Sequence, residues 1–433
     1  MGHLVNPDRD YRRLQQKLDC TVTGAPDSPA LMRILRLLFS PEDAQLASQV
    51  PGQLSTLDQI ARRTGISPEH LEPRLDAMAQ RGLLIDLARD GQRWFALAPV
   101  VIGFFEFTFM RARDDLPMAE LARLFDEYMG DRFARSVFDG GVGLGRSLVR
   151  EETLPEDDPT EILDWERASR LIQSATALGV SMCACRHKAL HLGKACEKPM
   201  EACLSLNFAA ESLVRNGMAR PLTVAQAMEV LQQSKEAGLA QTGDNVQRKP
   251  AYICNCCGCC CGMIEGIKTY NLQGAIATSN WIAAIGADAC RGCGRCVKAC
   301  PVDAIELVED DSGAKPVRRA VVDQEICLGC GVCVTSCKFG AIAMHGRARR
   351  VFTPETVFDR VVAMAIERGK LAEMLFERPE RLSHRALARL AVLLERSPPA
   401  RAALAIRPLR SAFLKAAVAA ARKTAGPIGR VLE

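Results

Sequence analysis

The sequence predicts a mostly helical, multidomain α+β protein. Three observations predict this class. Helical patterns recur towards both ends of the chain, an early helix pair with capping signals is followed by a hairpin signal, and a duplicated cysteine run marks a small separate domain. The length of 433 residues fits two to four domains. Nineteen cysteines, gathered in C-x2-C and C-x-C patterns, indicate metal ligation in a reducing compartment and not a disulfide framework.

Residues 29–100 carry three helix signals and then a hairpin. The first helix is expected from Pro29 to Phe39, the second from Ser55 or Thr56, and the third from Pro68 with an acidic first turn. Residues 83–97 predict a hairpin that turns at Asp90-Gly91. This order resembles a winged helix. The third helix mixes acidic with basic residues, so a role in protein contact or dimerisation is expected, and nucleic-acid binding is not.

Three further regions are expected after the hairpin. Residues 101–160 read as a helical connector, and residues 165–275 as an upstream cysteine-rich, cluster-binding region with a helix over 223–236. Residues 347–433 read as a basic helical region, with 18 Lys or Arg against 8 Asp or Glu, a net charge of +10 where the rest of the chain nets −5. Such helices could cap the preceding domain, meet an acidic redox partner, or touch anionic lipid.

Residues 282–345 contain two copies of the run C-x2-C-x2-C-x3-C, offset by 37 residues. The thiols are Cys290, Cys293, Cys296 and Cys300 in the first copy and Cys327, Cys330, Cys333 and Cys337 in the second. Three thiolates on one tight loop can hold three corners of a cubic iron–sulfur cluster, so the fourth ligand must come from elsewhere. Zinc also binds C-x2-C pairs, but evenly spaced thiols in a duplicated run favour iron–sulfur clusters.

This duplicated run resembles the bacterial two-cluster ferredoxin domain. The resemblance implies a ferredoxin-like fold with two [4Fe–4S] clusters, in which the last cysteine of each run binds the cluster of the other run. It assigns one cluster to Cys290, Cys293, Cys296 and Cys337, and the other to Cys327, Cys330, Cys333 and Cys300. Pro301 follows the first run as in the family, whereas Lys338 replaces the second proline and is expected to be solvated.

Ten more cysteines precede the repeat, besides the isolated Cys20: Cys183, Cys185, Cys196, Cys203, Cys254, Cys256, Cys257, Cys259, Cys260 and Cys261. The last six cannot all face one metal, because neighbouring side chains of an extended segment point in opposite directions. The first four could hold one cluster and four of the last six another, or each cluster could draw two ligands from each segment. A single zinc or a single cluster with spare thiols is the remaining alternative. One or two additional [4Fe–4S] clusters are expected.

The order of the motifs C-x-C-R, C-x6-C and C-N-C-C-G-C-C-C-G before the repeat resembles a group of bacterial and archaeal proteins. These are described as 4Fe–4S dicluster-domain or ferredoxin-like proteins, and the resemblance covers about residues 165–345. The C-C-G pairs also echo heterodisulfide-reductase subunits, without their long spacings. Arg186, directly after the C-x-C, is expected to bind the cofactor by donating to a cluster sulfide, or to bind an anionic partner.

These patterns predict function as well. No Ser–His–Asp set, phosphate loop or dinucleotide fingerprint is apparent. We expect a cytoplasmic iron–sulfur electron-transfer protein, or an electron-transfer subunit, that links a flavin or metal oxidoreductase to a low-potential carrier; it could form a homo-oligomer. No signal peptide or apolar span is seen. The alternatives are a redox-sensing winged-helix regulator and a catalytic reductase subunit acting at the C-x-C-C-G-C-C-C site.

Overall fold

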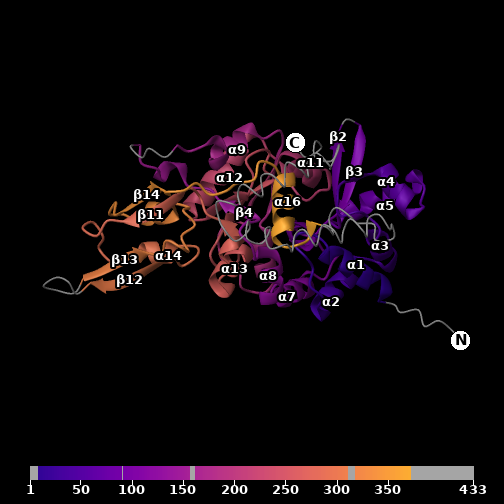
Figure 1. Ribbon diagram of the computed structural model, residues 1–433, viewed down its shortest axis with the longest axis horizontal. Helices are drawn as coiled ribbons and strands as arrows, with labels where there is room; N and C mark the ends of the chain where they lie inside the picture. Colours follow the sequence, from indigo (N-terminus) through magenta and orange to yellow (C-terminus); the bar gives the residue numbers. More distant parts are fainter. Residues whose placement is uncertain (1–7, 90, 157–160, 311–316, 372–433) are drawn as a thin grey trace, which may run out of the picture.

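The computed structural model describes residues 8–89, 91–156, 161–310 and 317–371. These residues form an elongated body with a mixed α/β architecture. The N-terminal helices lie at one end, a mixed sheet with its helices lies in the middle, and the duplicated cysteine run lies at the opposite end (Figure 1).

The N-terminal part begins with three helices, α1 (Arg9–Asp19), α2 (Pro29–Leu38) and α3 (Pro41–Ala47). A helix pair, α4 (Leu57–Thr64) and α5 (Pro68–Gln80), then precedes a three-stranded antiparallel sheet of order β1-β3-β2, made of β1 (Ser55–Thr56), β2 (Leu84–Arg89) and β3 (Gln92–Leu97). Thr56 caps α4 through a capping box with Gln59, and Gly65 ends it in the left-handed conformation at φ 72°. The helices and hairpin expected over 29–97 are therefore present at these residues.

The division expected at residues 29 and 101 differs from the core that the structure shows. Helices α6 (Phe105–Phe109), α7 (Met118–Tyr128) and α8 (Asp131–Phe138) follow the hairpin. Leu14 of α1, Leu35 of α2 and Phe125 of α7 belong to one hydrophobic cluster. Helix α1 also contacts α3, and α6 and α7 also contact α10, so the helices after the hairpin share one hydrophobic core with the N-terminal helices.

A seven-stranded sheet that the sequence did not predict occupies the middle of the molecule. Its order is β10-β4-β8-β9-β6-β5-β7, and only the β10–β4 pairing is parallel. The strands are β4 (Gly145–Ser147), β5 (Leu178–Met182), β6 (Glu201–Leu206), β7 (Arg220–Pro221), β8 (Ala240–Asp244), β9 (Tyr252–Cys256) and β10 (Ile276–Ala277). The sequence did not predict these strands because they are short and lack clear alternation.

Five helices accompany this sheet: α9 (Ala168–Ser174), α10 (Ala184–His191), α11 (Asn207–Arg215), α12 (Val224–Glu236) and α13 (Gly262–Tyr270). Helix α12 begins at the expected cap, Thr223, in a capping box with Gln226. Helices α10 and α13 each begin directly after a cysteine, Cys183 and Cys261, so their first turns bring thiols and backbone amides together.

The duplicated run folds as two matching halves. Strand β11 (Trp281–Ile285) pairs with β14 (Ile342–Gly346), and β12 (Ile305–Asp310) pairs with β13 (Val317–Val322), both antiparallel. The short helices α14 (Arg295–Ala299) and α15 (Val332–Ser336) start after Gly294 and Gly331, which occupy equivalent positions and have φ of 72° and 79°. The sequence repeat is thus a structural repeat.

Helix α16 (Val357–Glu367) does not cap this repeat. Its buried Arg360 donates from Nη1 to the Leu144 carbonyl at 2.7 Å and pairs with Asp244 of β8 at 3.2 Å. Val362 of α16 joins the N-terminal hydrophobic cluster. The first part of the basic region therefore packs between the N-terminal domain and the sheet. Residues 372–433 of that region lie outside the described residues. No helix among the described residues is long and apolar enough to cross a membrane.

Candidate metal centres

The structure brings the eight repeat cysteines together as two crossed sets. One small cavity is lined by Cys290, Cys293, Cys296 and Cys337, and another by Cys300, Cys327, Cys330 and Cys333. In each set, three thiols come from one run and the fourth from the other. This is the arrangement that cubic clusters require of the C-x2-C-x2-C-x3-C spacing.

Backbone features shape both repeat sites. The Ala304 amide donates to Cys300 Sγ at 3.2 Å, and the Ala320 amide donates to Cys290 Sγ at 3.4 Å. Gly329 has φ of 68°, and a Cβ there would lie 2.0 Å from the Trp281 carbonyl oxygen, so only glycine allows the loop to fold this closely. Burial raises the pKa of Cys330 to about 12, so the thiolate form depends on a bound cation.

Six upstream thiols gather beside the central sheet, and we call them the six-thiol group: Cys183, Cys185, Cys203, Cys254, Cys256 and Cys261. Cys261 Sγ lies 3.4 Å from Cys256 Sγ. Cys185 is hydrogen-bonded to Cys261, and Cys254 to both Cys203 and Cys256, while Cys183 interacts electrostatically with Cys185 and Cys203. Six thiols exceed the four that one cubic cluster needs.

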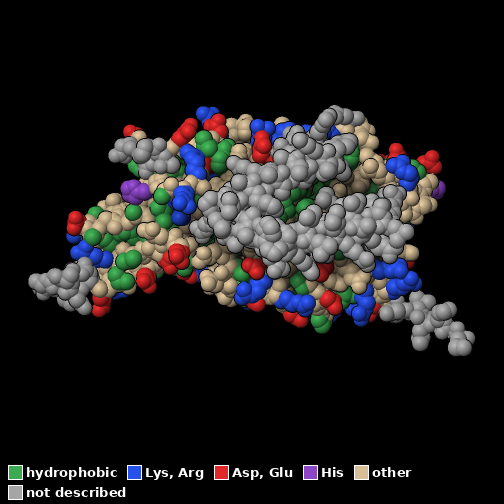
Figure 2. All heavy atoms as spheres, viewed as in Figure 1, with side chains coloured by type: hydrophobic (Ala, Val, Ile, Leu, Met, Phe, Trp, Pro, Cys, Tyr) green, Lys and Arg blue, Asp and Glu red, His purple; other side chains and the backbone are tan. Residues whose placement is uncertain are grey.

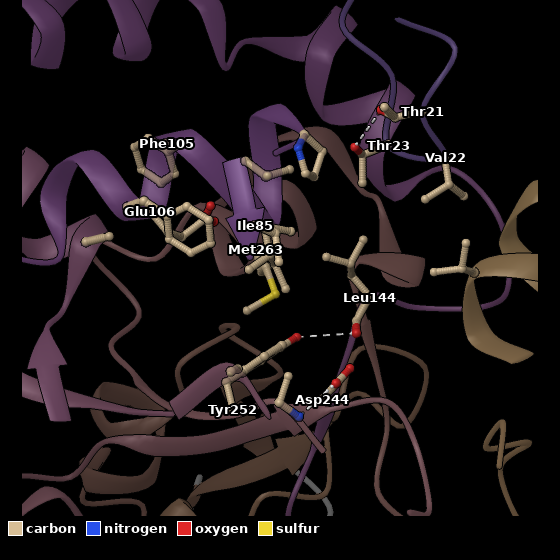
Figure 3. Close-up of a pocket in the computed structure, with 18 of the residues that line it drawn as sticks. Thr21, Val22, Thr23, Ile85, Phe105, Glu106, Leu144, Asp244, Tyr252 and Met263 are labelled. Carbon is tan, nitrogen blue, oxygen red and sulfur yellow. Dashed lines mark hydrogen bonds between the residues drawn. The ribbon is translucent and has the colours of Figure 1, made fainter. Parts of the chain in front are cut away.

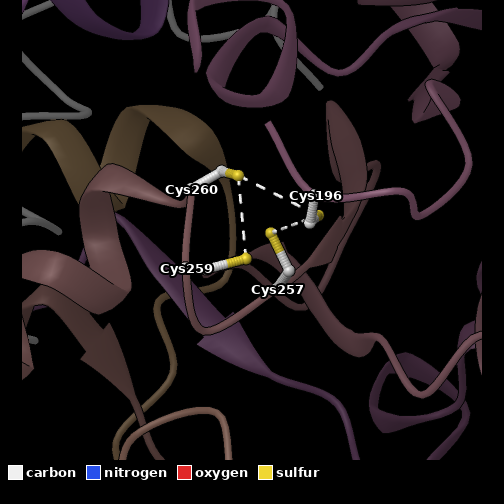
Figure 4. A group of neighbouring side chains, drawn as sticks. All are labelled: Cys196, Cys257, Cys259 and Cys260. Carbon is white, nitrogen blue, oxygen red and sulfur yellow. Dashed lines mark hydrogen bonds between the residues drawn. The ribbon is translucent and has the colours of Figure 1, made fainter. Parts of the chain in front are cut away.

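The other four upstream thiols form a separate, tighter set, the cysteine quartet of Cys196, Cys257, Cys259 and Cys260. All four sulfur atoms lie within 4.8 Å of one another. The Sγ atoms of Cys196 and Cys257 are 3.8 Å apart, those of Cys259 and Cys260 are 3.7 Å apart, and those of Cys260 and Cys196 are 3.9 Å apart. Figure 4 shows the four side chains converging on one point. The quartet can hold a metal ion.

Local geometry explains how the thiols are divided. Cys254 and Cys256 stand two residues apart on β9 and therefore share a face, whereas Cys257 points the other way. Cys203 lies beside Leu204, which pairs with Ile253, so it faces Cys254 across the β6–β9 pair. After β9 the chain turns, and the consecutive residues Cys259 and Cys260 both reach the quartet.

This division differs from both ligand partitions considered for the sequence. One upstream cysteine joins three from the loop in the quartet, and three join three in the six-thiol group. The structure does not bring Cys183, Cys185, Cys196 and Cys203 together as one set, because Cys196 follows α10 and reaches Cys257 instead. The sequence could not predict this division of the thiols, because it depends on the register between β6 and β9.

Arg186 stands between the two upstream groups. Its side chain is fully buried, and Nη2 donates to the Asn255 carbonyl at 3.3 Å. It also bonds Cys257 and Cys196 of the quartet and interacts with the charge of Cys183. Burial lowers the pKa of Arg186, but these thiolates outweigh it and raise the pKa overall. His187 is turned away, with Nδ1 at 2.8 Å from the Phe109 carbonyl oxygen.

A cavity of about 1210 Å³ opens against the six-thiol group. Its wall is mainly apolar, and sequence reasoning gave no sign of it because its residues come from distant segments. Figure 3 shows Phe105 and Glu106 on one side, Tyr252 and Asp244 on the other, and Met263 between them. Burial raises the pKa of Glu106 to about 7, although the Gly103 amide, 2.8 Å away, donates to its carboxylate.

The upstream thiol loop touches the repeat directly. A Cβ on Gly258 would lie 2.8 Å from the carbonyl oxygen of Pro301, the residue after Cys300. Lys268 of α13 pairs with Asp303 at 2.7 Å and donates to the Gly258 carbonyl at 3.4 Å. One hydrophobic cluster contains cysteines of both regions: Cys256, Cys261, Cys296, Cys327 and Cys333.

Comparison with known proteins identifies one part of the chain. Residues 289–341 match the family of the 4Fe-4S dicluster domain. No curated protein and no solved structure matched the chain. The matched domain supports multiple [4Fe–4S] clusters in this protein, and the upstream cysteine groups add further thiols that can hold metal.

Proposed function

We propose that this chain is an electron-transfer protein, or an electron-transfer subunit of a cytoplasmic oxidoreductase system. The clusters supply one-electron chemistry when bound. The two crossed thiol sets of the repeat would hold two clusters, and four of the six thiols beside the sheet would hold a third. The partners would be a flavin or metal oxidoreductase on one side and a low-potential carrier on the other.

The contact between Gly258 and Pro301 carries this proposal. It sets the upstream thiol loop against the segment that carries Cys300, inside a hydrophobic cluster shared by Cys256 and Cys333. Apolar packing excludes water from the space between the thiol groups, which lowers the reorganisation that each electron transfer requires. Electrons can thus pass between sites within one body instead of through solvent.

Metal content and electron paramagnetic resonance test the proposal. We expect at least twelve irons per chain in the anaerobically prepared protein, about four for each cubic cluster. Stepwise reduction should give interacting signals, because the clusters lie within one hydrophobic cluster. A chain with only eight irons would contradict the proposal, since the upstream thiols would then lie outside the electron path.

The cavity favours a second candidate function, a reductase acting on an apolar substrate. Glu106 faces the cavity with a pKa near 7, so its carboxyl can donate a proton beside the six-thiol group. Reduction of a quinone would take two electrons from reduced clusters, one proton from Glu106 and one from solvent. Menadione is a suitable probe because it is small and apolar.

The reductase candidate is tested with protein that has been reduced and freed of excess reductant. Menadione should reoxidise the wild-type protein at least about tenfold faster than Glu106→Gln, with equal iron content. Glu127→Gln, which changes an exposed carboxyl of α7, is the matched control and should match the wild type. Equal rates in all three proteins would remove this candidate.

For the N-terminal domain we propose a winged-helix-like adapter that contacts proteins. Arg93 of β3 is held by Asp76 of α5 at 2.6 Å and by Asp86 of β2 at 3.1 Å, so this cation is not available to phosphates. On the face shown in Figure 2, Lys and Arg are interspersed with Asp and Glu over the described surface. Nucleic-acid binding needs a concentrated basic surface. A gel-shift with duplex DNA at low salt that gave a complex would contradict the adapter role.

A further inference from the structure

The sulfur spacing of the cysteine quartet suits a single metal ion. Four thiolates around one zinc at about 2.3 Å form a tetrahedron whose edges are about 3.8 Å long. Three of the six Sγ–Sγ distances in the quartet are 3.7, 3.8 and 3.9 Å, and all six are within 4.8 Å. In a cubic cluster each iron carries one thiolate, which sets the ligand sulfurs about 6 Å apart.

The repeat provides an internal comparison. Its eight cysteines, which line the two crossed cavities, contain no three thiols within 4.8 Å of one another among the described residues. The six-thiol group contains no such set either, within the same part of the chain. The six-thiol group does contain one closer pair, Cys256 and Cys261, with their Sγ atoms 3.4 Å apart, but the quartet is the set in which four sulfur atoms all lie within 4.8 Å of one another.

The surroundings of the quartet also suit one closed site. Four thiols complete a tetrahedron, and within the described residues no His, Asp or Glu joins the set. Cys257 and Cys260 are buried in a small hydrophobic cluster with Ala189 and Leu239. The buried Arg186 bonds Cys196 and Cys257, and its positive charge offsets part of the net negative charge of a metal with four thiolates.

We propose that the cysteine quartet binds one Zn²⁺, which takes no part in electron transfer. Zinc is redox-inactive, and a four-thiolate site leaves no open position for substrate. The ion ties the segment after α10, through Cys196, to the loop after β9. Gly258 lies inside this loop, between the ligands Cys257 and Cys259, so the zinc fixes the surface that meets Pro301.

Element-specific measurements on the anaerobic full-length protein test this proposal. Mass spectrometry of metals should give one zinc per chain beside the irons. Zinc-edge X-ray absorption should show four sulfur neighbours at about 2.3 Å and no metal neighbour. In Cys259→Ala the zinc should be lost while the iron content stays constant. Cys20→Ser, at a cysteine outside both upstream groups, is the control and should keep both metals.

A second variant distinguishes the loss of a zinc ligand from misfolding of the protein. Cys259 is exposed, so Cys259→His can be accommodated, and zinc accepts three cysteines and one histidine. We expect this variant to retain zinc with three sulfur neighbours and one nitrogen neighbour. Absence of zinc with about sixteen irons, four of them lost in Cys259→Ala, would overturn the proposal. Absence of zinc together with the loss of one iron in Cys259→Ala would overturn the proposal as well, because the quartet would then bind a single iron. Either result leaves the proposed electron-transfer function standing, because that function depends on the repeat and the six-thiol group.

Discussion

Gly258 lies against the backbone of Pro301, and this contact joins the upstream thiol loop to the duplicated run. A methyl group at residue 258 would meet the Pro301 carbonyl oxygen at 2.8 Å and its Cα at 3.2 Å. Both atoms belong to the backbone beside Cys300, so neither can move without disturbing a predicted ligand. The absence of a side chain at Gly258 therefore sets how closely the two regions approach.

The first prediction concerns this contact. Gly258→Ala should lower the free energy of unfolding by about 1–3 kcal/mol, the usual cost of overpacking, and weaken the magnetic interaction between clusters. Gly262→Ala is the matched control, because a Cβ there meets nothing within 4 Å. Thermal unfolding and electron paramagnetic resonance of the reduced proteins provide the two measurements. Identical behaviour of the two variants would show that the contact is not rigid.

The second prediction tests the crossed ligand sets. Cys300→Ser should remove about four irons, and so should Cys330→Ser, because both residues line the same cavity. The double variant with both changes should lose no more iron than either single variant. Combining Cys300→Ser with Cys296→Ser should remove about eight, because Cys296 lines the other cavity. Additive loss in the first double variant would show that the sets are not crossed.

The third prediction follows from Glu106. Its folded pKa of about 7 exceeds the ordinary value of 4.5, so the folded state holds this proton more tightly than the unfolded chain. The free energy of unfolding should therefore fall as pH rises from about 4.5 to 7 and be constant above that range. Glu106→Gln should abolish this slope and stabilise the protein at pH 8 by roughly 2–3 kcal/mol.

Thermal unfolding under anaerobic conditions at pH 5, 6, 7 and 8 measures the slope for Glu106→Gln against the wild type. An ionised Glu106 disfavours the thiolate form of Cys185 by electrostatic repulsion. The same variant should therefore leave iron content unchanged or raise it. An unchanged pH slope in Glu106→Gln would show that another group causes the pH dependence.

The fourth prediction concerns the junction between the hairpin and α11. Asp86 of β2 is buried and accepts hydrogen bonds from Ser212 at 2.7 Å, Asn216 at 2.7 Å and Arg215 at 2.8 Å. Burial alone would raise its pKa, but these bonds lower it below 3.8. Asp86→Asn should reduce the free energy of unfolding by about 2–4 kcal/mol, because it leaves buried donors and Arg215 poorly paired.

The pH dependence of Asp86 has the opposite sign to that of Glu106. A depressed pKa contributes stability that is present above about pH 4 and is lost as pH falls through the folded value. Asp86→Asn should remove this acid-side loss, whereas Asp114→Asn, at an exposed site, should retain it. Anaerobic unfolding between pH 3 and 6 compares the two variants. Equal stability of both variants at neutral pH would mean that the hydrogen bonds of Asp86 contribute nothing to the free energy of unfolding.

Local sequence was sufficient wherever the interacting residues are neighbours in the chain. Thr56 and Thr223 are caps whose partners lie three residues away, so both helix starts were predictable. The seven-stranded sheet was not predictable, because β4 and β10 are separated by more than a hundred residues and each is only two or three residues long. The helix α16 was expected, but its place against Leu144 depends on a contact between distant segments.

The sequence by itself determined that residues 289–341 form a dicluster domain, because the C-x2-C-x2-C-x3-C spacing already sets three thiols around each site. The tertiary structure alone decided how the ten upstream cysteines divide. Pairing of β6 with β9 brought Cys203 to Cys254, and the turn after β9 sent Cys259 and Cys260 to Cys196. Strand register and turn direction arise from packing across the whole fold, so cysteine spacing alone does not predict them.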